Sequence, residues 1–163
     1  MYLYLGDITR METDAIVNAA GTDLRRCPGI CDAIFAAADT EKLERACRKL
    51  GRCRIGQAVA TPGCGLPCRY IIHVAGPRER FLLAGCYQNA LHKAYLCSCR
   101  RVAVPLIFSG DCHMPRAASL RVAGAAIADF CQRHPSMEVT LVLYRQSIYD
   151  MAKRILGWED APS

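Results

Sequence analysis

The chain lacks any apolar run approaching the roughly 18 to 20 residues that a membrane-spanning helix needs. Its first residues also lack the basic segment and following apolar stretch that are typical of a secretory signal peptide. We therefore expect a cytoplasmic protein with no membrane contact. Internal repeats, linkers and low-complexity segments are absent too, so we expect one domain, residues 1–163, large enough to bury its own core.

Cysteine, by contrast, is abundant, with 11 residues. In a reducing cytoplasm these residues are expected to be free thiols that pack as small apolar side chains. Two C-x3-C pairs and one C-x-C pair could be considered as zinc ligands, namely Cys27/Cys31, Cys64/Cys68 and Cys97/Cys99. No histidine lies near Cys27 and Cys31 in the sequence, and we expect neither a metal nor any other cofactor.

The net charge is +6, from 21 basic and 15 acidic residues. A basic surface attracts anions, among them a diphosphate ligand and nucleic acid. Most of the basic residues are scattered along the chain rather than gathered in a stripe, so they are interpreted as a solvated surface. Nucleic acid is not an expected partner.

Apolar patterns of strand and helix type alternate along the chain. The predicted strands are residues 2–5, 15–19, 57–61, 69–74, 102–108 and 138–144, and the predicted helices are residues 30–38, 41–50, 81–96, 116–133 and 147–156. Thr40 is expected to cap the second helix, and Gly51 to end it. This alternation predicts an α/β fold with three layers, α/β/α, around a central mixed, mostly parallel sheet.

The segment from Gly6 to Phe35, GDITRMETDAIVNAAGTDLRRCPGICDAIF, combines strands, a loop and the start of a helix. Such an arrangement directs backbone N–H groups and a helix N-terminus at a phosphate. GDIT followed by DAIVNAA resembles the opening of the macrodomain family. AIFAAA, the LxxxCxxLGxCxxGxAxxTPGxxLP stretch, RYIIHVAGP and VAVPLIFSG then follow in the family's order, so the resemblance covers most of the chain.

The resemblance implies a macrodomain fold and a ligand of the ADP-ribose class, either free or attached to a protein or small molecule. Ligands of open α/β sheets bind at the carboxyl ends of the strands, and the loops at residues 6–10, 21–29 and 109–115 follow such ends. Asp7 matches the residue that accepts a hydrogen bond from the adenine amino group, and Ile8 the neighbour whose backbone N–H meets the ring. A turn or helix-capping role is the alternative for Asp7.

Two loops match the phosphate-binding loops of the family. The expected ligand-binding residues are Asn18, Gly21, Gly29, Ile30 and Cys31 around the first loop, and Ser109, Gly110, Asp111, Cys112 and His113 in the second. Relatives usually carry several glycines where this chain has Arg26, Cys27 and Pro28. Proline removes one N–H donor and fixes φ, so the cradle for a diphosphate is expected to be weakened there. The charge of Arg25 or Arg26 could compensate, or these arginines could simply face water.

Catalytic residues are less well matched. In hydrolytic relatives an Asn aligns with Gly21 and an Asp with Cys31, so we expect ADP-ribose binding with weak or absent hydrolysis. A rearranged site for ADP-ribosyl hydrolysis or O-acetyl-ADP-ribose deacetylation would use Asp32, Cys31 or His113 as catalytic residues. A third hypothesis is an interaction module that has lost nucleotide binding. His73 lies within a predicted strand and is interpreted as a buried core residue.

Overall fold

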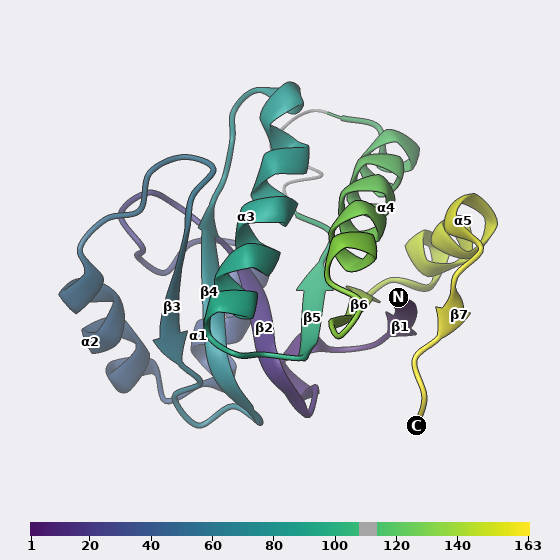
Figure 1. The fold of residues 1–163 in the computed structure, drawn as a ribbon. Coiled ribbons are helices and arrows are strands. Elements are labelled where there is room, and N and C mark those ends of the chain that lie inside the picture. The colour runs from purple at the N-terminus through teal and green to yellow at the C-terminus, as the bar shows by residue number, and fades with distance from the viewer. Residues whose placement is uncertain (108–113) are drawn as a thin grey trace.

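The structure is a computed structural model that describes residues 1–107 and 114–163. Its centre is a seven-stranded sheet in the order β3-β4-β2-β5-β6-β1-β7 (Figure 1). The strands are β1 (Tyr2–Leu5), β2 (Thr13–Ala20), β3 (Ala58–Pro62), β4 (Cys68–Ala75), β5 (Arg101–Pro105), β6 (Glu138–Leu143) and β7 (Glu159–Asp160). β3 runs antiparallel to β4, and every other neighbouring pair is parallel. The expected mixed, mostly parallel sheet is confirmed.

Helices cover both faces of this sheet. α1 (Ile30–Ala37) and α2 (Thr40–Leu50) pack on one face, and α3 (Leu83–Leu96), α4 (Arg116–Arg133) and α5 (Gln146–Leu156) pack on the other (Figure 1). Successive residues of a strand point to opposite faces. In β2, Ile16 accordingly joins the core beneath α1 and α2, whereas Ala15 and Val17 join the core beneath α3, α4 and α5. The three-layer architecture predicted from the sequence is confirmed.

Close packing fixes the helices that border the carboxyl end of the sheet. A Cβ on Gly124 of α4 would lie 2.3 Å from Cδ2 of Leu156, so the absence of a side chain there lets α5 approach α4. Tyr87 of α3 is fully buried, and its hydroxyl oxygen accepts a hydrogen bond of 2.8 Å from the backbone N–H of Ile107. These contacts hold α5 against α4, and Ile107, just after β5, against α3.

Some local expectations were wrong. Asp39, not Thr40, caps α2, because its Oδ1 accepts the backbone N–H of Lys42 at 3.2 Å. The Thr40 hydroxyl instead donates to the carbonyl oxygen of Phe35 at 2.6 Å. The strand expected at residues 102–108 ends earlier, at Pro105, although residue 108 itself lies outside the described residues.

Three short elements were not expected from the sequence. They are the 3-10 helices η1 (Ile8–Arg10) and η2 (Arg80–Leu82) and the edge strand β7. Within residues 1–107 and 114–163, none of the helices combines the length and the apolar character needed to cross a membrane.

Candidate functional site

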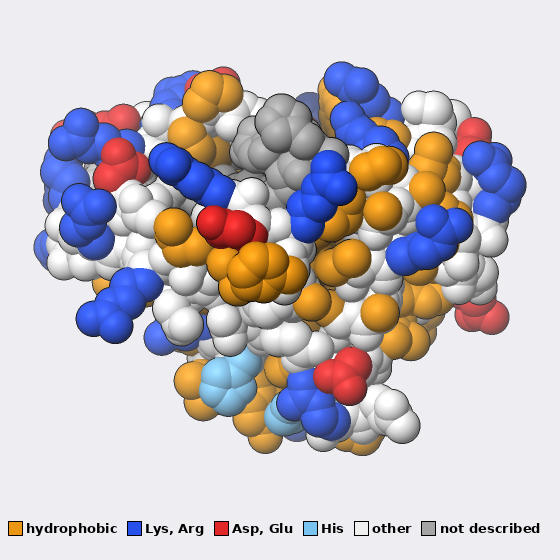
Figure 2. Space-filling model, turned by 90° about the horizontal axis from the view of Figure 1, so that it is seen from above, with side chains coloured by type: hydrophobic (Ala, Val, Ile, Leu, Met, Phe, Trp, Pro, Cys, Tyr) orange, Lys and Arg blue, Asp and Glu red, His pale blue; other side chains and the backbone are white. Residues whose placement is uncertain are grey.

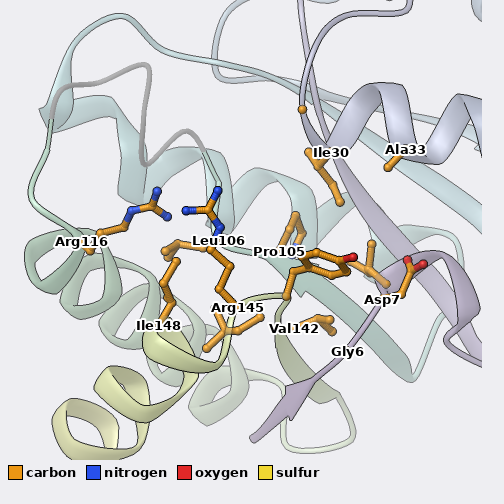
Figure 3. A pocket seen from close by; sticks show the side chains of 14 residues that line it. Gly6, Asp7, Ile30, Ala33, Pro105, Leu106, Arg116, Val142, Arg145 and Ile148 are labelled. Atoms are coloured by element: carbon orange, nitrogen blue, oxygen red, sulfur yellow. The ribbon is translucent and has the colours of Figure 1, made fainter.

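A cleft of about 530 Å³ lies at the carboxyl ends of β1, β5 and β6, beside the start of α1 (Figure 3). This volume is within the range of about 300 to 1,000 Å³ that is usual for small-molecule sites. The described residues that line it are Gly6, Asp7, Ile8, Gly29, Ile30, Ala33, Pro105, Leu106, Arg116, Val142, Leu143, Tyr144, Arg145 and Ile148. Asp7, Ile8, Gly29 and Ile30, which the sequence placed at a ligand site, are thus brought together.

Asp7 both caps η1 and faces the cleft. Its Oδ1 accepts hydrogen bonds from the backbone N–H and the hydroxyl of Thr9, at 2.9 and 2.7 Å. Among the described residues, Oδ2 makes no hydrogen bond. The capping interaction therefore holds the carboxylate in one orientation and leaves one oxygen to accept from a ligand. Ile8, only 3% exposed, forms part of the cleft floor next to it.

The start of α1 forms the opposite wall. Gly29 is the N-cap residue, with φ of +86° and ψ of −138°, a conformation that a side chain would strain. An added Cβ would meet nothing within 4 Å, so the backbone is open to the cleft. The first N–H groups of a helix have no acceptor within the helix, and here those of Ile30 and its successors begin at the cleft wall. This wall can hold an anion such as a phosphate.

The loop before α1 is closed by an ion pair. Nε of Arg26 lies 2.6 Å from Oδ1 of Asp32, and both side chains remain largely exposed. These two residues, with Cys27, Pro28 and Gly29, line a second, more open hollow of about 500 Å³. Because Gly29 borders both cavities, Asp32 lies beside the cleft and not within its lining.

Asn18 and Cys31 are buried beneath the loop and do not line the cleft. Both side chains are 0% exposed. Sγ of Cys31 accepts from the backbone N–H of Cys27 at 3.3 Å and lies 3.8 Å from Nδ2 of Asn18. Burial, together with the hydrogen bond to Cys31, raises the pKa of the Cys27 thiol to about 12. Thiolate chemistry is therefore disfavoured at Cys27 near neutral pH.

His73 is a buried core residue, as the sequence analysis proposed. Its Nδ1 lies 3.1 Å from Nδ2 of Asn18, and its Nε2 lies 2.9 Å from the hydroxyl oxygen of Thr61. With the Asn18 amide as donor to Nδ1, the imidazole is neutral and donates from Nε2 to Thr61. Burial lowers the His73 pKa to about 4, which keeps the ring neutral. Oδ1 of Asn18 is buried without a hydrogen-bond partner among the described residues.

Comparison with known proteins agrees with this geometry. The family model described as "Macro domain" matches residues 17–123. The chain belongs to the macrodomain family. A protein of Escherichia fergusonii named O-acetyl-ADP-ribose deacetylase is 36% identical over 168 residues, and the alignment covers 96% of this chain and 94% of the Escherichia fergusonii protein. A macro domain-containing protein of Lactiplantibacillus plantarum is 39% identical over 148 residues, covering 85% of this chain and 86% of its own.

Solved macrodomain structures show the same fold. The Oceanobacillus iheyensis macrodomain with ADP has a TM-score of 0.88 and 31% identity, covering 95% of this chain and 88% of that one. The Trypanosoma brucei macrodomain in complex with ADP-ribose has a TM-score of 0.88 and 27% identity, and the match covers 95% of this chain and 68% of the Trypanosoma brucei chain. The family assignment drawn from the sequence motifs is confirmed.

The second predicted phosphate loop and Gly21 contribute no described residue to the lining of the cleft. Ser109, Gly110, Asp111, Cys112 and His113 lie outside the described residues. Gly21 is described but does not line the cleft; its carbonyl oxygen accepts the backbone N–H of Leu24 at 3.2 Å.

Sequence reasoning missed the wall of the cleft formed by the end of β6 and the starts of α4 and α5. Tyr144 and Arg145 follow β6 directly, Arg116 is the first residue of α4, and Ile148 lies in α5. The rule that sites form where parallel strands end applies to β6 as well. The apolar pattern predicts a strand through Tyr144, whereas β6 ends at Leu143, so the pattern did not indicate that Tyr144 and Arg145 form a loop at this strand end.

Lys and Arg side chains are spread around the face that carries these strand ends (Figure 2). Arg116 and Arg145 extend into the cleft from two different helices (Figure 3). The surroundings of the cleft therefore favour an anionic ligand.

Proposed function

We propose that this macrodomain binds ADP-ribose, either free or attached to a protein or small molecule. The observation that carries the proposal is that a single cleft brings Asp7 and Ile8 of η1 together with the start of α1. The free carboxylate oxygen of Asp7 can accept a hydrogen bond from the adenine amino group, since a carboxylate only accepts. The backbone N–H of Ile8 can donate to a ring nitrogen of the same base.

The diphosphate is assigned to the N-terminus of α1. Gly29 keeps this wall free of side-chain atoms, and the unpaired N–H groups and dipole of α1 favour negative charge. Pro28 contributes no donor, so we propose a cradle built mainly from Gly29, Ile30 and the following N–H groups. The ligands named in the related structures, ADP and ADP-ribose, support this class of ligand.

Hydrolysis is proposed to be weak or absent. Gly21 has no side chain to position a substrate, and Cys31 is buried in the core, where its thiol does not reach the cleft. The carboxylate of Asp32 is held by Arg26, outside the lining of the cleft. Within residues 1–107 and 114–163, neither Cys31 nor Asp32 is positioned in the cleft as an acid or base, and we propose that the general acid–base contribution of about 10² to 10⁴ to the rate is lost.

A second candidate is hydrolysis of an ADP-ribosyl or O-acetyl-ADP-ribose bond by a rearranged site. The similarity to the Escherichia fergusonii protein favours it, as does the place of Asp32 in the hollow that shares Gly29 with the cleft. This function would require Asp32 to leave Arg26 and act as a base towards water. Release of ADP-ribose from a modified protein, lost in Asp32→Asn, would establish it.

The compartment and partners are proposals as well. All ten cysteines in the described part of the chain are free thiols, which supports a cytoplasmic location. Proteins carrying ADP-ribose are proposed partners because the cleft is open at the surface.

Calorimetric titration with ADP-ribose tests the binding proposal. Asp7→Ala should weaken binding by about 10- to 150-fold, or about 1.5 to 3 kcal/mol, because it removes a hydrogen bond to a charged acceptor. Thr9→Val is the matched control, since it removes only the hydroxyl that bonds to Oδ1 of Asp7. Equal affinity in Asp7→Ala and the unmodified protein would refute the adenine assignment, and the absence of binding in every form would leave the interaction-module hypothesis.

A further inference from the structure

Two arginines in the cleft have no counter-charge among the described residues. Arg116 and Arg145 point their guanidinium groups toward one another at the end of the cleft remote from Asp7 (Figure 3). Neither makes an ion pair with a carboxylate in residues 1–107 or 114–163. Two like charges directed at one place repel each other unless an anion lies between them.

The helices that carry these residues increase the positive potential. Arg116 is the first residue of α4, and Arg145 is the N-cap of α5, without a side-chain capping bond. The first turns of both helices contain no acidic residue. A helix N-terminus carries partial positive charge, so a cation there is ordinarily unfavourable. Both arginines therefore occupy positions that an anionic ligand would stabilise.

The strand order relates this position to the parts of the ligand. The cleft lies over three neighbouring strands in the order β5-β6-β1, and neighbouring strands are about 4.8 Å apart, so β1 and β5 are separated by roughly 10 Å. The proposed adenine site follows β1, and the proposed diphosphate site lies at the start of α1, on the opposite wall of the cleft. In this arrangement the adenosine ribose, which joins the two groups, is assigned to the part of the cleft over β6 and β5. Arg145 follows β6, and Arg116 begins the helix that follows β5.

The hydroxyl groups of an unmodified adenosine ribose are neutral and do not require two guanidinium groups. We propose that the cleft prefers ADP-ribose that carries a phosphomonoester on a hydroxyl of the adenosine ribose, which Arg116 and Arg145 hold together. Guanidinium groups bind phosphate oxygens in a forked geometry, and an arginine near this ribose is the usual means of accommodating a 2′-phosphate. This inference rests on the proposed binding of ADP-ribose and specifies its substrate class.

The test compares ADP-ribose with ADP-ribose 2′-phosphate by calorimetry. The unmodified protein should bind the 2′-phosphate at least about tenfold more tightly. Arg145→Gln and Arg116→Gln should each reduce this preference, and the double variant should abolish it while still binding ADP-ribose. Arg48→Gln, on the exposed side of α2, is the matched control and should leave both affinities unchanged. Adenosine 2′,5′- and 3′,5′-bisphosphate, compared with 5′-AMP, then identify the oxygen that carries the preferred phosphate.

The outcomes separate this inference from the proposed function. Equal affinity of the unmodified protein for ADP-ribose and its 2′-phosphate would overturn the inference alone. Equal losses for both ligands in the arginine variants would also overturn it, because the arginines would then serve the diphosphate. Failure of both ligands to bind would overturn the proposed function together with the inference.

Discussion

The free energy of unfolding of this macrodomain should depend on pH between the pKa values that His73 has in the folded protein and in the unfolded chain. Burial lowers the His73 pKa from its ordinary value of 6.5 to about 4 in the folded protein. As pH falls from 6.5 to 4, His73 becomes protonated in the unfolded chain but stays neutral in the folded protein. Stabilisation by neutral His73 is therefore complete above about pH 6.5 and is lost progressively towards pH 4. Each pKa unit corresponds to about 1.4 kcal/mol, so the total loss is about 3 kcal/mol.

The structure explains why the ring resists protonation. The imidazole is 1% exposed, and its two nitrogens are engaged by Asn18 and Thr61. With the Asn18 amide donating to Nδ1, protonation there would place two donors against each other in the core. A charged imidazole without a counter-ion would add a desolvation cost.

Urea unfolding at half-unit intervals between pH 4 and 7.5 measures the effect. The free energy of unfolding of the unmodified protein should fall more steeply than that of His73→Gln, by up to about 1.4 kcal/mol per pH unit between pH 6 and 4.5. Titration of carboxylates affects both proteins alike, so the difference isolates His73. His92→Gln, which changes an exposed histidine of α3, is the control and should follow the unmodified protein. Parallel curves for the unmodified protein and His73→Gln would refute the reasoning.

Two further predictions concern the first phosphate loop. Pro28→Gly should tighten ADP-ribose binding in calorimetry, because it restores an N–H donor beside Gly29. It should also lower the free energy of unfolding by about 0.4 to 1 kcal/mol, because glycine increases the entropy of the unfolded chain. Unchanged or weaker binding by the folded variant would show that Pro28 does not limit binding of the diphosphate. Gly21→Asn with Cys31→Asp should raise release of ADP-ribose from a modified protein above either single variant. A Cβ at position 21 would lie an acceptable 3.4 Å from Oδ1 of Asp23, and a carboxylate at position 31 would accept the N–H of Cys27 and the amide of Asn18. Efficient release by the unmodified protein would contradict the second prediction.

Most of the sheet was predictable from the sequence because its strands are short, buried apolar runs. The same patterns could not reveal β7, since Glu159 and Asp160 form an exposed two-residue edge without an apolar signal. Thr40 and Asp39 are both suitable N-cap residues, and only the backbone geometry shows that Asp39 accepts from Lys42.

The sequence could predict the site residues that lie at the ends of strands and helices. It could not predict the features of the site that depend on how the loop and helices pack. Asp7 directly follows a predicted strand and matches the adenine-binding residue of the family, and Gly29 directly precedes a predicted helix. The burial of Asn18 and Cys31 arises because the loop folds over them, and a linear pattern does not contain that information. Arg116 and Arg145 line the same cleft only because α4 and α5 begin at the same edge of the sheet.

The central claim, recognition of adenine by Asp7, is tested most directly by exchanging the hydrogen-bonding pattern on both sides. In Asp7→Asn, Oδ1 can keep its bonds to Thr9 while an amide NH₂ replaces Oδ2. The unmodified protein should prefer ADP-ribose over inosine diphosphate ribose, whose base has a carbonyl oxygen in place of the amino group. Asp7→Asn should reduce this preference by about tenfold or more in calorimetric titrations, because its amide can donate to the carbonyl oxygen, although the N1–H of hypoxanthine still opposes the N–H of Ile8. An unchanged ratio of the two affinities in the two proteins would contradict the placement of adenine at Asp7.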